Sequence, residues 1–247
     1  MELRGRVALV TGAGTRVGQA IAVGLGARGM RVAVHYRGSA DGAAETVRRI
    51  VAAGAGGQGT PFCADLLDRS APAALVAQVV AQLGGLDLLV NSAALMERTP
   101  FGETTVEQWE RIFALNLRAP FFLAQAAAPH LRAAAGGGGI VNIADLAAFE
   151  TWPGYLPHGI TKHAIVRLTE SLAQLLAPTV RVNAVAPGTV LLPMGWSEAD
   201  ATRLRDATPL ARNGSPGDVV QAVNYLLDAD FVTGQTIIVD GGRRVRR

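Results

Sequence analysis

The chain has 247 residues, 49% of them hydrophobic and 17% charged, and these proportions exclude a disordered protein. The formal net charge of +3 falls to −1 when the four arginines of residues 243–247 are subtracted, so a nucleic-acid-binding protein is not predicted. No apolar run approaches the roughly 18 residues of a membrane span, and the single cysteine, Cys63, excludes an internal disulfide bond.

Apolar, β-rich runs alternate with helix-like segments along the whole chain. Strands are predicted at 6–12, 31–36, 60–66, 86–94, 139–145, 180–188 and 235–241. Helices are predicted at 16–29, 41–54, 71–84, 105–134 and 156–177. Strands that are apolar on both faces and alternate with helices indicate a parallel sheet covered on both sides. The sequence therefore predicts one doubly wound, Rossmann-like α/β domain over 1–247, with three layers.

Capping residues mark several helix starts. Thr104 to Glu107 reads as a capping box ahead of the long fourth helix. Two further starts, at Ser197 and Ser215, lie within 190–216, a segment that breaks the strand–helix rhythm. Such a segment between two late strands is typical either of a substrate lid or of a packed surface loop, and the sequence leaves both open.

The basic residues are unevenly divided. Of 23 lysines and arginines, 22 are arginine, and the one lysine is Lys162. Arginine supplies surface charge but stays protonated, whereas a lysine amine can change its charge state. We interpret Lys162 as a position where the chemistry requires an amine.

The run VTGAGTRVG, residues 10–18, follows the first predicted strand and opens the first predicted helix. Glycines in such a turn let backbone N–H groups approach a pyrophosphate at the N-terminus of a helix. The strand–turn–helix context predicts a dinucleotide site.

The second predicted strand runs into HYRGS, residues 35–39, with no acidic residue before Asp41. A fold that binds NAD usually places an acidic residue there for the ribose 2′-hydroxyl. Arg37 and Ser39, with Arg16 from the first turn, would instead hold a 2′-phosphate through charge-assisted hydrogen bonds. The predicted cofactor is therefore NADPH/NADP+.

Six motifs occur in order along the chain: TGAGTRVG at 11–18, NSAA at 91–94, NIAD at 142–145, HGITK at 158–162, APG at 186–188 and VTGQTIIVDGG at 232–242. In this set the chain resembles the short-chain dehydrogenase/reductase family over essentially its whole length. It is most similar to the pteridine-reductase-type and 3-oxoacyl-(acyl carrier protein)-reductase-type members, which use NADPH. Arg16 and HYRGS match the pteridine-reductase pattern.

The resemblance, together with the segment at 35–39, implies a cofactor site built from several loops. The residues assigned to it are Gly12, Arg16, Val17, Gly18, Tyr36, Arg37, Ser39, Asp65, Asn91, Ala93, Lys162, Pro187, Gly188 and Val190. Asp65 would hydrogen-bond the adenine, and Lys162 the nicotinamide ribose.

The family's catalytic tetrad of Asn, Ser, Tyr and Lys corresponds to Asn116, Asp145, His158 and Lys162. Asn116 and Lys162 agree with the family, Asp145 replaces Ser as in pteridine reductases, and His158 replaces Tyr. His158 and Lys162 are four residues apart, so on a helix they share a face. A carboxylate near His158 would favour and orient its imidazolium form, and we hypothesise an Asp145–His158 proton-donating pair. A site that has lost catalysis is the alternative.

Substrate residues are indicated more weakly. Met96, Trp152, Tyr155 and Trp196, with Asp145, fall where the family lines its pocket. Aromatic side chains at such positions serve core packing as often as substrate binding.

The predicted function is an NADPH-dependent oxidoreductase that reduces a carbonyl or imine-like C=N bond of a small ketone or pterin-like substrate. A catalytically silent NADP(H)-binding sensor or subunit is the alternative. The resemblance implies a homotetramer or homodimer through helices 105–134 and 156–177 and the last strand. A cytoplasmic location is expected, with no metal site and no membrane or nucleic-acid partner.

Overall fold

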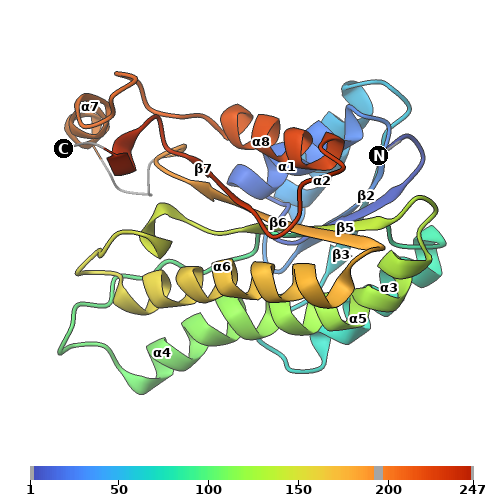
Figure 1. Cartoon of the computed structure of the whole chain (residues 1–247), viewed down its shortest axis with the longest axis horizontal. Coiled ribbons are helices and arrows are strands. Elements are labelled where there is room, and N and C mark those ends of the chain that lie inside the picture. Colours follow the sequence, from blue (N-terminus) through green and yellow to red (C-terminus); the bar gives the residue numbers. More distant parts are fainter. Residues whose placement is uncertain (1–2, 192–196, 246–247) are drawn as a thin grey trace.

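The computed structural model describes residues 3–191 and 197–245. Its centre is one sheet of parallel strands in the order β3-β2-β1-β4-β5-β6-β7 (Figure 1). The strands are β1 Val7–Val10, β2 Arg31–Tyr36, β3 Gln58–Cys63, β4 Leu88–Asn91, β5 Gly138–Ile143, β6 Val180–Pro187 and β7 Thr236–Val239. Parallel neighbours need a crossover between them, and the helix-like segments of the sequence supply it.

Helices cover both faces of the sheet (Figure 1). One layer holds α1 Arg16–Gly26, α2 Ala40–Ala52 and α8 Pro216–Asp228. The other holds α3 Ala71–Leu83, α4 Val106–Phe113, α5 Ala119–Ala133 and α6 Leu156–Leu176. The short α7, Glu198–Asp206, lies near the C-terminus of the chain in space (Figure 1). The predicted three-layer, doubly wound fold is confirmed. Among the described helices, none combines the length and apolarity of a membrane span.

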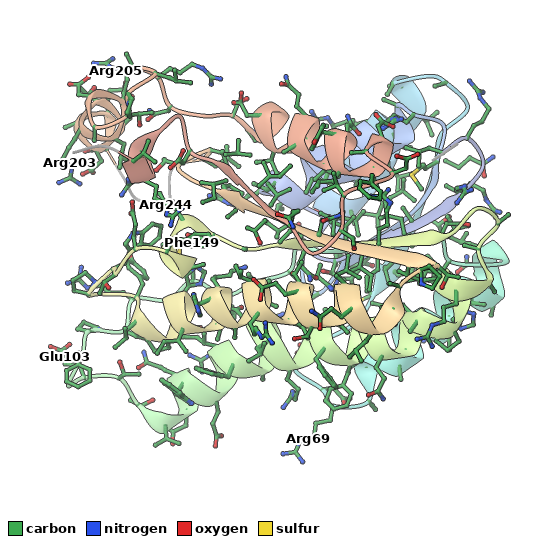
Figure 2. The ribbon with its side chains drawn as sticks, viewed as in Figure 1. Arg69, Glu103, Phe149, Arg203, Arg205 and Arg244 are labelled. Carbon is green, nitrogen blue, oxygen red and sulfur yellow. The ribbon has the colours of Figure 1, made fainter. Side chains whose placement is uncertain are left out.

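The strand β1 shows why these runs form a central sheet. Val7 and Leu9 pack into the core on the α3–α5 side, whereas Ala8 and Val10 pack into the core on the α1–α8 side. Successive side chains of a strand point to opposite faces, so a strand between two helical layers must be apolar at every position. Figure 2 shows side chains filling the space on both sides of the sheet.

The predicted helix 105–134 is interrupted. It consists of α4, the π-helical segment η1, Ala114–Arg118, and α5. Its predicted capping box is wrong by one residue, because Thr105 rather than Thr104 is the N-cap. The Thr105 hydroxyl accepts from the backbone N–H of Gln108 at 3.2 Å, and the Gln108 side chain accepts from the N–H of Thr105 at 3.0 Å. The Thr104 hydroxyl instead donates to the Pro100 carbonyl at 3.1 Å.

The helix starts predicted at Ser197 and Ser215 are confirmed. Each serine caps its helix reciprocally with an aspartate three residues later, Asp200 for α7 and Asp218 for α8. α7 lies within the described part of 190–216, and α8 continues from the end of that segment. The segment thereby returns toward the carboxyl end of β6.

Candidate active site

The strand order reverses between β1 and β4, because β2 and β3 extend to one side and β5 to β7 to the other. In open parallel sheets the crevice outside the carboxyl ends at this point is the usual ligand site. About half of the predicted site residues lie in the loops after β1 to β6, and most of the others lie at the ends of β2, β4 and β6 or on α1, η1 and α6.

The turn after β1 is unusually close-packed. Gly12 has φ +66°, and a Cβ atom there would lie 2.9 Å from the Ala93 Cα. A Cβ on Gly18 would lie 2.3 Å from the Gly12 carbonyl oxygen. Both positions therefore require glycine. The turn delivers the chain into the N-terminus of α1, whose first turn holds no acidic residue and begins with Arg16 at φ 55°.

Two residues that sequence reasoning overlooked hold this turn in place. The His35 Nδ1 accepts from the Gly12 N–H at 3.1 Å, so the Nε2 carries the proton and donates to the Ala64 carbonyl, also at 3.1 Å. Burial lowers the pKa of His35, with the Ala64 hydrogen bond and the Asp65 charge opposing it. The Thr11 hydroxyl accepts from the N–H groups of Ser92 and Ala93. A polar residue near the carboxyl end of a buried strand is the sequence feature that could have identified both residues.

The residues assigned to the adenosine end lie together after β2 and β3. An Arg37 guanidinium nitrogen is 3.9 Å from an Asp65 carboxylate oxygen, and about half of each side chain is exposed, 57% and 50%. Ser39 is the N-cap of α2 but makes no side-chain capping bond, and its hydroxyl lies beside Gly14. Tyr36 packs partly against the core. No acidic side chain from β2 replaces the missing one.

The residues assigned to the nicotinamide end are more deeply placed. The Asn91 amide donates to the Asn142 side chain at 2.9 Å, and the Asn91 Oδ1 is buried without a hydrogen bond. Pro187 ends β6, and a Cβ on Gly188 would lie 2.9 Å from the Asp240 Cβ. Val190 is buried in the same core cluster that Val17 packs against.

The π-helical segment η1 carries Asn116, and π-helical turns within α-helices often occur at functional sites. The Asn116 Oδ1 accepts from the Leu95 N–H at 2.7 Å, and its Nδ2 donates to the Leu95 carbonyl at 2.9 Å. The same Nδ2 lies 3.2 Å from the Thr161 hydroxyl. Asn116 therefore ties the loop after β4 to α6.

His158 is 2% exposed and lies in the first turn of α6. Its Nδ1 is 3.0 Å from the Leu95 carbonyl, an acceptor, so the Nδ1 carries a proton. Its Nε2 is buried without a hydrogen bond and lies 3.7 Å from an Asp145 carboxylate oxygen. The ring is thus held at one nitrogen and presents the other to a carboxylate.

Asp145 is the N-cap of the short helix η2, Leu146–Ala148. One carboxylate oxygen accepts from the Ala147 N–H at 2.8 Å, which fixes the side chain, and the other faces His158. The side chain of Asp145 is 25% exposed, so this carboxylate, unlike the imidazole, is open to solvent or a ligand.

Lys162 is 5% exposed, one turn after His158 on α6, and its Nζ donates to the Ile143 carbonyl at 2.8 Å. Burial lowers the pKa of Lys162 to about 8, and the Asp145 charge partly opposes this. The structure thus brings Asn116, Asp145, His158 and Lys162 together at the carboxyl ends of β4 and β5.

The predicted substrate residues divide. Trp152 and Tyr155 lie near each other, with ring centroids 6.5 Å apart, and both line a cavity of about 240 Å³ between the loop after β5 and the start of α6. His158 and Asp145 do not line this cavity, so the Asp145–His158 pair lies outside it. Met96 is 41% exposed on the loop after β4. Trp196 lies outside the described residues.

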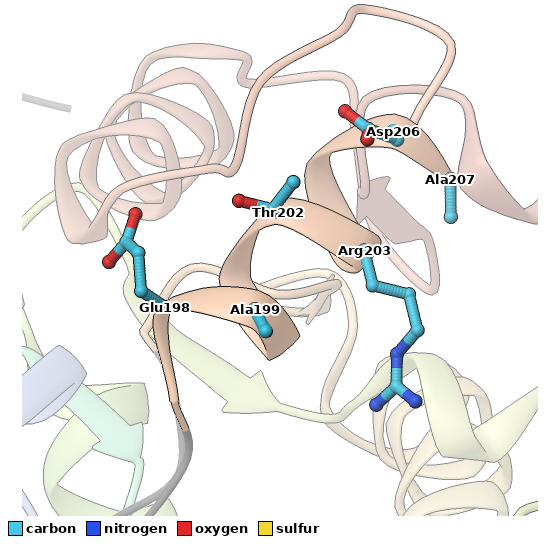
Figure 3. Close-up of a pocket in the computed structure, with 6 residues that line it drawn as sticks. All are labelled: Glu198, Ala199, Thr202, Arg203, Asp206 and Ala207. Atoms are coloured by element: carbon cyan, nitrogen blue, oxygen red, sulfur yellow. The ribbon is translucent and has the colours of Figure 1, made fainter.

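A larger hollow of about 750 Å³ lies on α7, lined by Glu198, Ala199, Thr202, Arg203, Asp206 and Ala207 (Figure 3). None of the predicted site residues contributes to it. Within residues 3–191 and 197–245 there is no group of three or more potential metal ligands from His, Cys, Asp and Glu.

The observed residues fit a dinucleotide with an added phosphate. The glycine turn leaves no room for side chains at Gly12 and Gly18, and α1 offers an N-terminus free of acidic side chains. A parallel sheet with such a turn at its switch point and a buried His, Asp and Lys beside it defines a nicotinamide-dependent oxidoreductase.

Comparison with known proteins places the chain within that class. A family model described as enoyl-(acyl carrier protein) reductase matches residues 12–244. The chain belongs to the short-chain dehydrogenase/reductase family.

Three relatives cover nearly the whole chain. It is 34% identical to a 3-oxoacyl-(acyl carrier protein) reductase of Staphylococcus aureus, over 95% of this chain and 96% of the relative. It is 33% identical to 3β-hydroxysteroid dehydrogenase 1 of Eggerthella lenta, over 98% of this chain and 94% of the relative. A blue fluorescent protein from a metagenomic library, solved with NADPH, is 31% identical with a TM-score of 0.89, covering 98% of this chain and 99% of that one. The chain is an oxidoreductase with a nicotinamide cofactor.

Proposed function

We propose that the chain is an NADPH-dependent reductase of a carbonyl or imine-like C=N bond, with His158 as the proton donor. The observation that carries this proposal is the His158 Nε2, which is buried without a hydrogen bond, 3.7 Å from the Asp145 carboxylate. The names of two relatives, a 3-oxoacyl-(acyl carrier protein) reductase and a hydroxysteroid dehydrogenase, support a ketone over a pterin-like C=N substrate.

NADPH as the cofactor is supported by the residues that would hold its 2′-phosphate. Arg16 follows β1, and Arg37 and Ser39 follow β2, the neighbouring parallel strand, so we assign the 2′-phosphate to these three side chains. The solved relative contains NADPH. When bound, this cofactor supplies a hydride to the carbon of the C=O or C=N bond. The remaining residues assigned to the cofactor by resemblance retain those roles in the proposal.

The chain itself supplies the proton. The Leu95 carbonyl holds the His158 Nδ1–H, so a second proton on the ring can only occupy the Nε2. The Asp145 carboxylate stabilises the resulting imidazolium by charge and orients it. The Nε2 is itself closed to solvent, so its proton passes by way of the partly exposed Asp145 carboxylate to the oxygen or nitrogen that gains negative charge. The neutral ring is reprotonated from solvent by the same route.

Lys162 and Asn116 hold the surroundings. The buried Lys162 amine donates to the Ile143 carbonyl. We assign this amine to the binding of the nicotinamide ribose. Asn116 keeps the Leu95 carbonyl in position to anchor His158. The segment 190–216 is proposed as the substrate lid, and Met96, Trp152, Tyr155 and Trp196 as the pocket walls.

Replacement of His158 tests the proposal. We expect His158→Ala to lower kcat for NADPH oxidation with a ketone panel by about 100-fold or more, because general acid catalysis contributes 10²–10⁴. NADPH affinity should stay within about twofold. Asp145→Asn keeps an acceptor for the Ala147 N–H but removes the charge, and a smaller loss of about tenfold or more is expected.

His130→Ala is the control, because His130 lies in the last turn of α5 and lines neither of the two cavities described above. It should keep wild-type kcat. Full turnover by His158→Ala contradicts the proposal. NADPH binding with no turnover of ketones, quinones, imines or dihydropterins would favour the silent NADP(H)-binding protein.

Oligomer formation is part of the proposal, with a homotetramer or homodimer in the cytoplasm. It is supported by large apolar side chains exposed on one helical layer: Trp109 at 41%, Phe121 and Phe122 at 43% each, and Leu175 at 69%. The edge strand β7 is only half-buried at each of its four positions. A partner subunit would cover both surfaces.

A further inference from the structure

The basic C-terminal segment folds back onto the loop that follows Asp145. After β7, the Asp240 carboxylate accepts from the Gly242 N–H at 2.8 Å and from the Arg244 N–H at 2.7 Å. These bonds form the turn into the short helix η3, Arg243–Val245. Figure 2 shows Arg244 beside Phe149 of that loop.

Arg243 joins three segments of the chain. One guanidinium nitrogen donates to the Thr189 hydroxyl at 3.3 Å, at the start of the segment proposed as a lid. Another lies 3.7 Å from a Glu150 carboxylate oxygen, too far for a direct hydrogen bond. The group also lies 5.9 Å from the centroid of the Trp152 ring. The side chain is 25% exposed, so its remaining donors are accessible.

Arg244 adds a second cation. Its guanidinium carbon lies 4.8 Å from the centroid of the Phe149 ring. Within the described part of the chain no carboxylate forms a salt bridge with it; the Asp240 oxygens near its backbone are occupied by N–H groups. An arginine that stacks on an aromatic ring keeps its in-plane N–H donors free for an anion.

These cations lie near the proposed proton donor. Asp145 and Phe149 flank the three-residue helix η2 at its two ends. At a rise of about 2 Å per residue for a 3-10 helix, their Cα atoms are about 8 Å apart. A substrate that reaches from Asp145 to the start of this loop would span about the length of one aromatic ring with its substituents.

Three arginines lie around this loop, because Arg98 is exposed and lies against Gly154 beside residues 149–155. Three carboxylates accompany them. Glu150 lies on the loop and accepts from the Trp152 ring N–H at 3.1 Å, Asp240 lies at the turn before η3, and Asp145 lies at the other end of η2. Within the described residues, Arg244 stacks on Phe149 and makes no salt bridge with any of them.

We propose that Arg243 and Arg244 are specificity-determining residues that bind a carboxylate group of the substrate. The substrate class is a small aromatic or otherwise planar ketone that carries a carboxylate about one ring away from its carbonyl. Its planar body packs on the aromatic side chains of the loop. Its carboxylate accepts hydrogen bonds from the Arg244 guanidinium and from the Arg243 N–H groups that face Glu150. This inference deepens the proposed function and rests on it.

The experiment compares 4-acetylbenzoate with its methyl ester, in which a methyl group masks the carboxylate of the same aryl ketone. With wild-type protein and NADPH, kcat/KM is expected to be at least tenfold higher for the acid. The double variant Arg243→Gln/Arg244→Gln should lose that preference through KM for the acid, with kcat/KM for the ester within about twofold. Arg48→Gln removes an equivalent exposed charge on α2, where it pairs only with Glu45, and should leave the preference unchanged.

Equilibrium binding separates this inference from the proposed function. Titration of the NADP+ complex with each compound, by calorimetry, should show the acid bound at least tenfold more tightly than the ester and the difference lost in the double variant. Arg-dependent preference without turnover supports carboxylate recognition and rejects the proposed reductase. Turnover or binding that does not distinguish acid from ester, or a preference retained by the folded double variant, overturns the inference. So does the absence of binding by either compound.

Discussion

At the scale of single residues, the charge state of buried groups determines how the protein responds to pH. The unfolded chain holds the Lys162 proton up to a pKa near 10.5, whereas the native amine releases it at about 8. Between these values the unfolded state binds more protons, so raising the pH favours the native state. Burial of the Lys162 amine destabilises the native state mainly when the amine is charged.

Lys162→Met tests that cost. We expect the wild-type free energy of unfolding to rise by about 2 kcal/mol, relative to that of Lys162→Met, between pH 8 and 10. Urea unfolding of both proteins at several pH values measures this difference, which cancels the titration of all other groups. Parallel curves for the two proteins would show that the buried amine does not titrate as described.

His35 responds in the opposite pH range. Its pKa is lowered by burial, so the stabilisation from the neutral ring is complete above about 6.5 and is lost as the pH falls through the lower native value. Protonation also turns the His35 Nδ1 from an acceptor into a donor facing the Gly12 N–H.

We therefore predict that, as the pH falls below 6.5 through the lowered native pKa of His35, the Kd for NADP+ rises up to about tenfold more in wild type than in His35→Gln, the equivalent of one hydrogen bond. Glutamine can accept from Gly12 but does not titrate, and the phosphates of NADP+ titrate equally in both proteins. Fluorescence titration measures both values. An identical pH dependence would remove His35 from any part in shaping the turn.

At the scale of elements, the π-helical segment η1 gives the chain a feature that a regular helix lacks. The wider turn accompanies the placement of Asn116 against the Leu95 backbone, where it satisfies both the N–H and the carbonyl. His158 depends on the same carbonyl. Asn116 thus supports the loop after β4 directly and the His158 ring through the Leu95 carbonyl.

Asn116→Ala should lower the free energy of unfolding by about 1 kcal/mol, because it leaves the partly buried Leu95 N–H without its partner. It should also lower kcat more than it raises KM, since His158 loses the support of its anchor. Urea unfolding and steady-state kinetics check the two parts, with Thr105→Ala as a control that costs about 1 kcal/mol at the helix start but leaves kcat unchanged. Normal kcat in a destabilised Asn116→Ala would confine the residue to a structural role.

At the scale of the whole molecule, the exposed aromatic residues of α4 and α5 are the main unexplained surface. Trp109→Glu/Phe122→Glu should convert the proposed oligomer into smaller species, because a partner subunit cannot bury two carboxylates at this face. Sedimentation velocity measures the change. Val51→Glu, which alters a more exposed apolar residue on α2, should leave the assembly intact. A monomeric wild-type protein would contradict the proposed association.

The same scale shows what the sequence could predict. Strand–helix alternation and the glycine turn are local patterns, and from them the layers and the ligand edge of the sheet follow. The one-residue error at Thr104 arose because two adjacent threonines can both cap a helix, and the choice depends on the contact with Pro100. The role of His35 and the return of Arg243 to Glu150 join residues more than 20 positions apart, which no local pattern encodes.

The unequal use of lysine and arginine has a practical consequence for this fold. Lys162 carries the chain's only side-chain amine, and it is 5% exposed with its Nζ bonded to the Ile143 carbonyl. An acylating reagent can reach that nitrogen only while the start of α6 is displaced from the sheet. The rate of acylation at this one position therefore reports how often the active site opens, without an engineered label and without interference from surface amines.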